Sequence, residues 1–179
     1  MTHKFKFDLF RRYKSYLQEI EEQQAWAKEN APVIESLKAK LFKIAGHQIS
    51  LEPYPFLSEI VDHGQYLDFP VKFRRMRRNR CHDNVSLIWQ QRTQHSRLKA
   101  IVTGYAMSNE DGMWRPHSWG LTGTYILETT VGIDECFGII MDGEDADAFV
   151  AGHIPATVSR YFRPAEEPLP PMTMTRHTP

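Results

Sequence analysis

The sequence of 179 residues has few cysteines, no net charge and no long hydrophobic run. Two cysteines are too few for a disulfide framework, so the sequence predicts a protein of a reducing compartment. No run of about 18 apolar residues occurs, which excludes a membrane-spanning helix and predicts no membrane partner. The N-terminus lacks the continuous apolar stretch of a signal peptide. We therefore expect a cytoplasmic protein, or an effector exported without a cleaved signal.

Neither sign of charge is in excess, and the spacings typical of zinc sites are missing. The chain has 22 Lys and Arg and 22 Asp and Glu residues, so its formal net charge of +0 predicts no nucleic-acid partner. No C-x-x-C or H-x-x-x-H pair occurs, and we expect neither a metal site nor a cofactor. The composition, 41% hydrophobic and 25% charged, is that of a globular protein that buries a core.

Two segments near the N-terminus have the apolar period of helices. Between positions 7 and 27, apolar residues recur every three or four positions among charged ones. A break that includes Pro32 separates this segment from a second one, which ends at Gly46. We expect three regions, namely a helical hairpin over 1–47, a main domain over 48–160 and a loosely ordered tail over 161–179.

The pattern changes from helical to strand-like at about Leu98. Segments rich in β-branched and aromatic residues follow one another at short turn signals, too closely for crossover helices. The expected strands are 100–107, 113–121, 124–130 and 137–141, arranged as an antiparallel meander. A short helix with Ser58 as its N-cap is expected before them. The sequence therefore predicts an α+β fold in which a helix bearing a cysteine packs on an antiparallel sheet.

Cys81 opens a segment in which Val85, Ile88 and Trp89 share one face of a helix. A thiol at a helix N-terminus lies at the positive end of the macrodipole, which lowers its pKa. The basic run at 72–80, with six Lys and Arg residues, acts in the same direction. Most free cysteines are small buried hydrophobic residues, and that interpretation stays open. The charged residues on both sides of Cys81 count against it.

His117 and Glu128 are expected to lie close together. The turn signal Thr122-Gly123 has its midpoint at about 122.5, so residues at equal distances from it face each other across two antiparallel strands. This places Glu128 opposite His117. A carboxylate beside an imidazole accepts its N–H and fixes its tautomer. Cys136 lies instead among acidic residues, which raise a thiol pKa, and we expect it to be structural.

Three short motifs in this region carry a family resemblance. They are Val102-Thr103-Gly104-Tyr105, His117-Ser118-Trp119 and Glu128-Thr129-Thr130. With a cysteine that opens a helix, they resemble the transglutaminase-like branch of the papain-fold cysteine hydrolase superfamily. The resemblance covers residues 81–141, about a third of the chain. The chain departs from the family pattern where Ser118 replaces alanine, where Glu-Thr replaces Asp-Pro, and where no glycine precedes Cys81.

The resemblance implies acyl transfer with Cys81 as nucleophile, His117 as base and Glu128 as the orienting acid. A tetrahedral intermediate also needs an oxyanion hole, made by the backbone N–H of Cys81 and one further donor. The candidates for that donor are Gln65, Asn79, Asn84 and Trp114. The residues expected to contact the substrate are Arg78, Arg80 and Trp119.

The sequence thus predicts a cysteine-dependent hydrolase or acyltransferase that acts on an amide, isopeptide or ester bond of a protein or peptide-like substrate. A peptidase or deamidase is the expected form. A non-catalytic effector or binding module on the same fold is an alternative. The basic run at 72–80 has three open interpretations: a solvated loop paired with acidic residues, a phosphate or nucleic-acid binder, or a site that selects an acidic substrate. The oligomeric state is not predicted.

Overall fold

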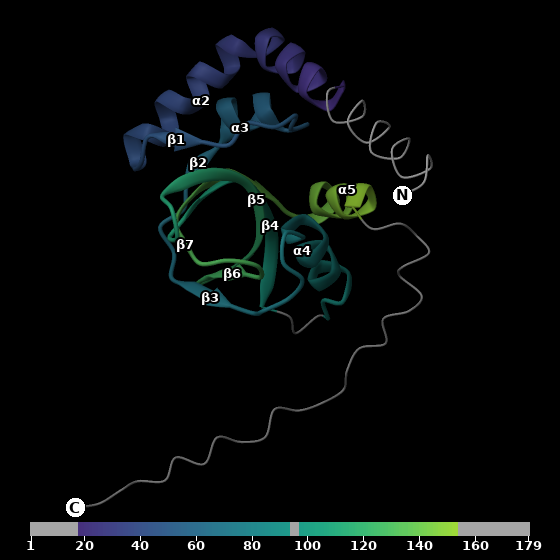
Figure 1. Ribbon diagram of the computed structural model, residues 1–179. Coiled ribbons are helices and arrows are strands. Elements are labelled where there is room, and N and C mark those ends of the chain that lie inside the picture. The colour runs from purple at the N-terminus through teal and green to yellow at the C-terminus, as the bar shows by residue number, and fades with distance from the viewer. Residues whose placement is uncertain (1–17, 94–96, 154–179) are drawn as a thin grey trace, which may run out of the picture.

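A computed structural model of the chain describes residues 18–93 and 97–153. A seven-stranded, mostly antiparallel sheet curls upon itself, and the helices lie on its outer side (Figure 1). The strand order is β2-β7-β4-β5-β6-β3, with β1 beside β5. The α+β class expected from the sequence is confirmed. The tail expected at 161–179 lies outside the described residues.

The first four helices correspond to segments predicted from the sequence, but the first two do not form a hairpin. Backbone hydrogen bonds cross the junction between them, from Asn30 to Trp26 and from Ile34 to Asn30, so the chain bends without folding back. Pro32 lies in the first turn of the second helix, where it removes a single backbone hydrogen bond and its ring bends the path by crowding the carbonyl group four residues earlier. The helices are residues 18–29, α2 (Ala31–Ile44), α3 (Leu57–His63), α4 (Cys81–Gln90) and α5 (Gly143–His153).

Ser58 is not an N-cap as expected. It lies inside α3, whose N-cap is Phe56 and has no side-chain capping bond. The helix begins one residue earlier than the serine because Leu57 is buried and Ile60 is fully buried, so packing determines its start.

The sheet keeps the predicted antiparallel order only in part. Strands β4, β5 and β6 pair in sequence, but β7 returns to pair with β4 and not with β6, so the sheet is not a meander. Strands β1 and β3 add to β5 and β6 in parallel. The strands are β1 (Gln48–Ile49), β2 (Gln65–Tyr66), β3 (Val71–Phe73), β4 (Leu98–Ser108), β5 (Met113–Thr122), β6 (Ile126–Glu128) and β7 (Ile133–Met141).

Glycine allows β4 and β7 to approach closely at the centre of the sheet. A Cβ on Gly104 would overlap the carbonyl oxygen of Phe137, and Gly138 faces the backbone of Thr103 in the same way. Gly104 also lies opposite His117 in the register of β4 and β5. The glycine of the V-x-G-Y motif is therefore required by strand packing next to the site.

The core consists of three clusters on the two faces of the sheet. The inner cluster is formed almost entirely by strand residues, Trp119 among them. One outer cluster joins the sheet to α4 and α5, and the other joins it to α2 and α3. Leu37 and Leu41 of α2 are fully buried beside Tyr105 and Trp114, so α2 shares the core of the sheet. None of the described helices combines the length and the apolar composition that crossing a bilayer requires.

Candidate active site

Cys81 is the first residue of α4, as the sequence predicts. Its N-cap, Arg80, makes no side-chain capping bond, so the first backbone N–H groups of the helix have no capping partner. Val85, Ile88 and Trp89 anchor the helix in the outer cluster with α5, which holds its N-terminus against the sheet. Cys81 is only 9% exposed. Packing of the helix thus determines where the sulfur lies.

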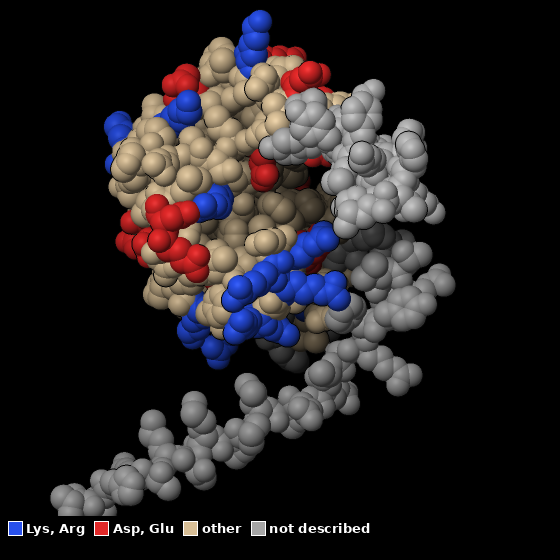
Figure 2. Space-filling model, viewed as in Figure 1, with Lys and Arg blue, Asp and Glu red and all other residues tan. Residues whose placement is uncertain are grey.

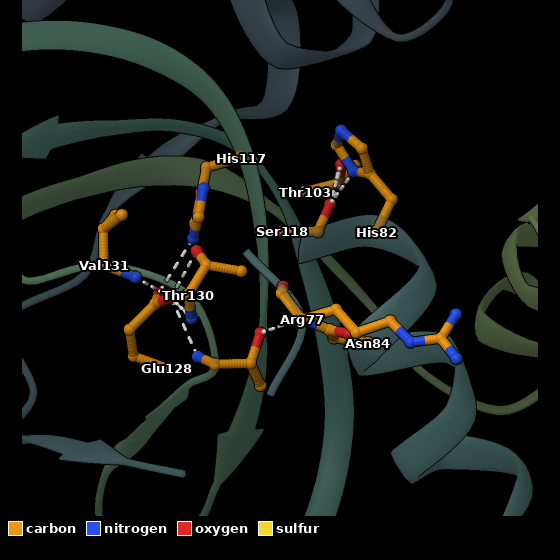
Figure 3. A network of polar contacts seen from close by, with 10 residues as sticks. Arg77, His82, Asn84, Thr103, His117, Ser118, Glu128, Thr130 and Val131 are labelled. Atoms are coloured by element: carbon orange, nitrogen blue, oxygen red, sulfur yellow. Dashed lines mark hydrogen bonds and ion pairs between the residues drawn. The ribbon is translucent and has the colours of Figure 1, made fainter. Parts of the chain in front are cut away.

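His117 of β5 and Glu128 at the end of β6 are in direct contact (Figure 3). Nε2 of His117 lies 2.8 Å from Oε2 of Glu128, and Glu128 is fully buried. Because this carboxylate occupies Nε2, Nδ1 is the ring nitrogen that remains to face the Cys81 thiol, which lines the same pocket. The interaction of the thiol with the imidazole shifts the pKa of both groups. The three side chains thus form a continuous thiol–imidazole–carboxylate chain.

The register that brings His117 and Glu128 together differs from the predicted one. Gly120 pairs with Leu127 and Leu121 with Ile126, so the turn is centred one residue later than expected. Extending this register puts Glu128 beside Trp119, and its carboxylate reaches His117 diagonally. Moving the turn centre by one whole residue keeps the side chain on the same face of the sheet, which is why the expected contact still forms.

The loop after Glu128 holds its carboxylate in place. Oε1 accepts hydrogen bonds from the backbone N–H groups of Thr129 (2.8 Å), Thr130 (2.6 Å) and Val131 (3.3 Å), and from the Thr130 hydroxyl (3.0 Å). Figure 3 shows these bonds converging on one oxygen while the other faces His117. An ionised carboxylate accepts such bonds best, so the loop favours the charged form of Glu128.

The pKa values of the three groups are shifted in the directions that separate charge. Burial opposes ionisation of Cys81, but hydrogen bonds with His117 and His82 lower its pKa to about 5. Burial likewise opposes protonation of His117, yet its bonds to Cys81 and Glu128 raise its pKa to about 10. Burial would raise the pKa of Glu128, whereas His117 and the loop N–H groups hold it below the usual range. Between these values the site is a thiolate and an imidazolium.

The pKa values of the two cysteine thiols are shifted in opposite directions. Burial raises the pKa of the Cys136 thiol well above its ordinary value, and the charges of Glu128 and Glu135 add to this shift. Cys136 is 2% exposed on the inner face of the sheet. Of the two thiols, Cys81 alone is set to ionise near neutral pH.

A pocket of about 330 Å³ opens beside Cys81 and His117. Its wall has an apolar part, formed by residues such as Ala106 and Ile133, and a polar part that includes Glu52 and Arg115. The guanidinium of Arg115 binds Asp111 at 2.6 and 2.8 Å, so its charge is already paired. The volume accommodates a side chain or a short backbone segment of a larger molecule.

A second histidine, His82, is held beside the nucleophile by a buried chain of hydroxyl groups. Its Nδ1 lies 2.7 Å from Oγ of Ser118, and that oxygen lies 2.7 Å from Oγ1 of Thr103 (Figure 3). Thr103 in turn contacts the hydroxyl of Tyr54. His82 is not among the site residues predicted from the sequence. The feature of the sequence that could have indicated His82 is Ser118. Side chains alternate along a strand, so Ser118 faces away from His117 and needs a polar partner on the other face of the sheet.

Of the four oxyanion candidates, only Asn79 lines the pocket with Cys81. It has a left-handed backbone, with φ of 55°, directly before the N-cap. The indole N–H of Trp114 is donated to Ala45, and the amide N–H of Asn84 is donated to the carbonyl of Arg77. Gln65 is exposed on β2, on the far side of β7 and β4 from β5.

The expected substrate contacts are separated by the structure. Trp119 is fully buried and stacks on the His117 ring, with 5.8 Å between ring centroids, so it lies behind the histidine. Arg78 and Arg80 are exposed in the segment before α4. Arg80 forms an ion pair with Asp83 at 3.3 Å. Trp119 therefore supports the histidine, whereas the two arginines are open to solvent.

No protein-family model, curated protein or solved structure matches the chain. The family resemblance of its motifs therefore remains a prediction. Among the described residues, no group of three or more His, Cys, Asp or Glu side chains is placed to hold a metal ion. What is chemically distinctive about the site is its ion pair of thiolate and imidazolium.

Proposed function

We propose that the protein is a cysteine-dependent hydrolase or acyltransferase, with Cys81 as nucleophile, His117 as acid and base, and Glu128 as the orienting acid. The observation that carries this proposal is the buried chain from the Cys81 thiol through His117 to Glu128, with Nε2 and Oε2 2.8 Å apart. This order and polarity suit a nucleophile, a general base and a group that fixes the base. The transglutaminase-like resemblance of the motifs points to the same class.

The first half of the reaction would form a thioester. The Cys81 thiolate attacks the acyl carbon of an amide, isopeptide or ester, and a C–S bond forms as the carbonyl oxygen takes up charge. The backbone N–H of Cys81 lies at the start of α4 and is one donor for that oxygen; Asn79 is the candidate for the second. His117 then gives its Nδ1 proton to the leaving nitrogen or oxygen as that bond breaks.

The second half would release the acyl group. Neutral His117 takes a proton from water, or from an acceptor amine, as the latter attacks the thioester carbon. The C–S bond breaks, the thiolate returns and His117 is again an imidazolium. Hydrolysis and transfer thus differ only in the acceptor. We propose a peptidase or deamidase as the form, in a reducing compartment, because the free thiolate would be oxidised elsewhere.

Trapping the acyl-enzyme tests this proposal. The protein is mixed with p-nitrophenyl acetate, quenched in acid after one turnover and digested, and the acetylated peptide is identified by mass. We expect acetate on Cys81 as a thioester that hydroxylamine removes. The Cys136→Ser variant should form the same adduct. Absence of acetate on Cys81, or an equal rate in His117→Ala at pH 6, would instead favour a binding module on this fold.

A further inference from the structure

Residues 72–80, here called the basic loop, present their charges to solvent directly before the nucleophile. All six of its Lys and Arg residues are exposed, and Met76 alone is partly buried. Figure 2 shows Lys and Arg side chains gathered in a band at the end of the molecule that carries β3 and α4 in Figure 1. Because Cys81 follows at once, this charge lies beside the pocket that holds the thiol.

The charges of the basic loop are largely unneutralised within the described part of the chain. Arg80 pairs with Asp83, and the Lys72 ammonium lies 4.3 Å from the centre of the Tyr125 ring. The other four cations make no ion pair with a described carboxylate; they are Arg74, Arg75, Arg77 and Arg78. A solvated loop would instead be paired with acidic residues, for which the candidates are Asp134, Glu135, Asp142, Glu144, Asp145 and Asp147. In the structure Asp147 pairs with Arg92.

The backbone of the basic loop is held in a defined position next to the site. The N–H of Arg74 donates to the carbonyl of Glu128 (2.8 Å), and that of Met76 donates to the carbonyl of Thr129 (2.9 Å). The amide of Asn84 in α4 donates to the carbonyl of Arg77 (2.7 Å). Four guanidinium groups are therefore presented from an ordered scaffold, which lowers the entropic cost of binding an anion there.

The start of the loop favours an extended polypeptide as the occupant. Strand β3 is the last strand in the sheet order, so its second edge has no described partner. Val71 and Phe73 on this strand are 42% and 54% exposed. An open edge with exposed apolar side chains is the surface on which an extended peptide adds as a strand.

We propose that the basic loop and the edge of β3 bind an acidic, extended polypeptide segment of the substrate and so bring its acyl group to Cys81. This inference rests on the proposed function. Acyl chemistry selects a polypeptide over a nucleic acid, because a nucleic-acid backbone has no amide or ester carbonyl for a thiolate to attack. The acidic residues lie along the loop and not inside the pocket, where Glu52 would repel them.

Affinity labelling with two matched peptides tests the proposal. Both are octapeptides with an N-terminal iodoacetyl group; one has four Glu residues and the other has Gln at those positions. Labelling of Cys81 is followed at pH 6 by intact mass and peptide mapping, and each rate is divided by the iodoacetamide rate of the same variant. We expect about a tenfold advantage for the acidic peptide at low ionic strength. It should shrink in 0.5 M NaCl, where charges are screened within a few ångströms.

Two variants with the same net charge show whether the preference for the acidic peptide depends on the basic loop or on the overall charge of the protein. The quadruple variant R74Q/R75Q/R77Q/R78Q should lose the advantage of the acidic peptide. The control K28Q/K43Q/R97Q/K99Q changes four exposed cations outside the basic loop, with the same change in net charge, and should keep it.

The remaining outcomes distinguish failure of the acidic substrate from failure of the proposed function. Equal labelling by both peptides, with iodoacetamide still faster in the wild type than in His117→Ala, would reject the acidic substrate and leave the proposed function standing. If iodoacetamide labels Cys81 no faster in the wild type than in His117→Ala at pH 6, both the acidic substrate and the proposed function are rejected. An oligonucleotide of equal charge that blocks labelling and binds more tightly than the acidic peptide would reassign the loop to nucleic acid.

Discussion

Replacing His117 by Ala should slow the alkylation of Cys81 by iodoacetamide in mildly acidic solution and accelerate it in alkaline solution. In the wild type, hydrogen bonds with His117 and His82 outweigh burial and lower the pKa of Cys81 to about 5. Without His117, the thiol loses the larger of these bonds and a neighbouring positive charge. Its pKa should then rise toward the ordinary value of 9.0.

The size of the effect follows from ionisation and nucleophilicity together. At pH 6, about 90% of a thiol with a pKa near 5 is ionised, against about 0.1% of one with the ordinary value, a ratio of about 900. A thiolate of lower pKa is intrinsically less nucleophilic, and four pKa units correspond to a factor of about 40–100. The wild type should therefore react about 10–20 times faster at pH 6. The order should reverse slightly above neutral pH, where the variant also ionises.

The assay is the second-order rate of iodoacetamide addition to Cys81 between pH 5.5 and 9, read by peptide mass. The wild-type rate should be flat above pH 6, whereas the rate of His117→Ala should rise about tenfold per pH unit up to its pKa. His63→Ala, an exposed histidine on α3, is the matched control and should follow the wild type. A wild-type rate that still climbs tenfold per unit from pH 6 to 8 would refute the ion pair.

Three further predictions test the surroundings of the site. Glu128→Gln should lower the free energy of unfolding at pH 7 by about 3 kcal/mol, because it breaks a buried charge pair. The folded pKa of Glu128 lies below its ordinary 4.5, so its ionised form stabilises the fold above pH 4.5 and loses this effect as pH falls through the folded pKa. Urea denaturation at pH 7 and pH 3 should show the difference shrinking in acid; an equal loss at both would point to packing. His82→Gln should raise the pKa of Cys81 by less than His117→Ala does, measured from the same alkylation profile; no shift would mean that His82 has only a structural role. Gly104→Ala should destabilise the fold by about 1–3 kcal/mol by urea denaturation, because its Cβ meets the backbone of Phe137. A Cβ at Gly152 in α5 would have no heavy atom within 4 Å, so Gly152→Ala should leave the free energy of unfolding unchanged or raise it. Similar changes in the free energy of unfolding for the two variants would contradict the close approach of β4 and β7.

The sequence by itself determined the elements whose signal is local. The apolar period after Cys81 predicted a helix that begins at the thiol, because residues three and four apart share a helix face wherever the helix is packed. The four predicted strands all exist, since β-rich segments between turn signals need no knowledge of their partners. The proximity of His117 and Glu128 was also predictable, because two strands joined by a short turn can pair in few ways.

Only the tertiary structure decided the features that depend on partners distant in sequence. Nothing in the sequence of β7 specifies that it pairs with β4. Strands β1 and β3 have only two and three residues, too few to show an alternating apolar pattern. The first two helices are joined by a bend at Asn30, where backbone hydrogen bonds continue from one helix into the next. The interruption of the apolar period near Pro32 does not show whether the chain bends there or folds back. His82 meets Ser118 and Thr103 because α4 packs on the face of the sheet opposite His117. Side-chain types reveal candidate chemistry, but packing between elements decides which atoms meet, and so it was the fold that placed both histidines beside one thiol.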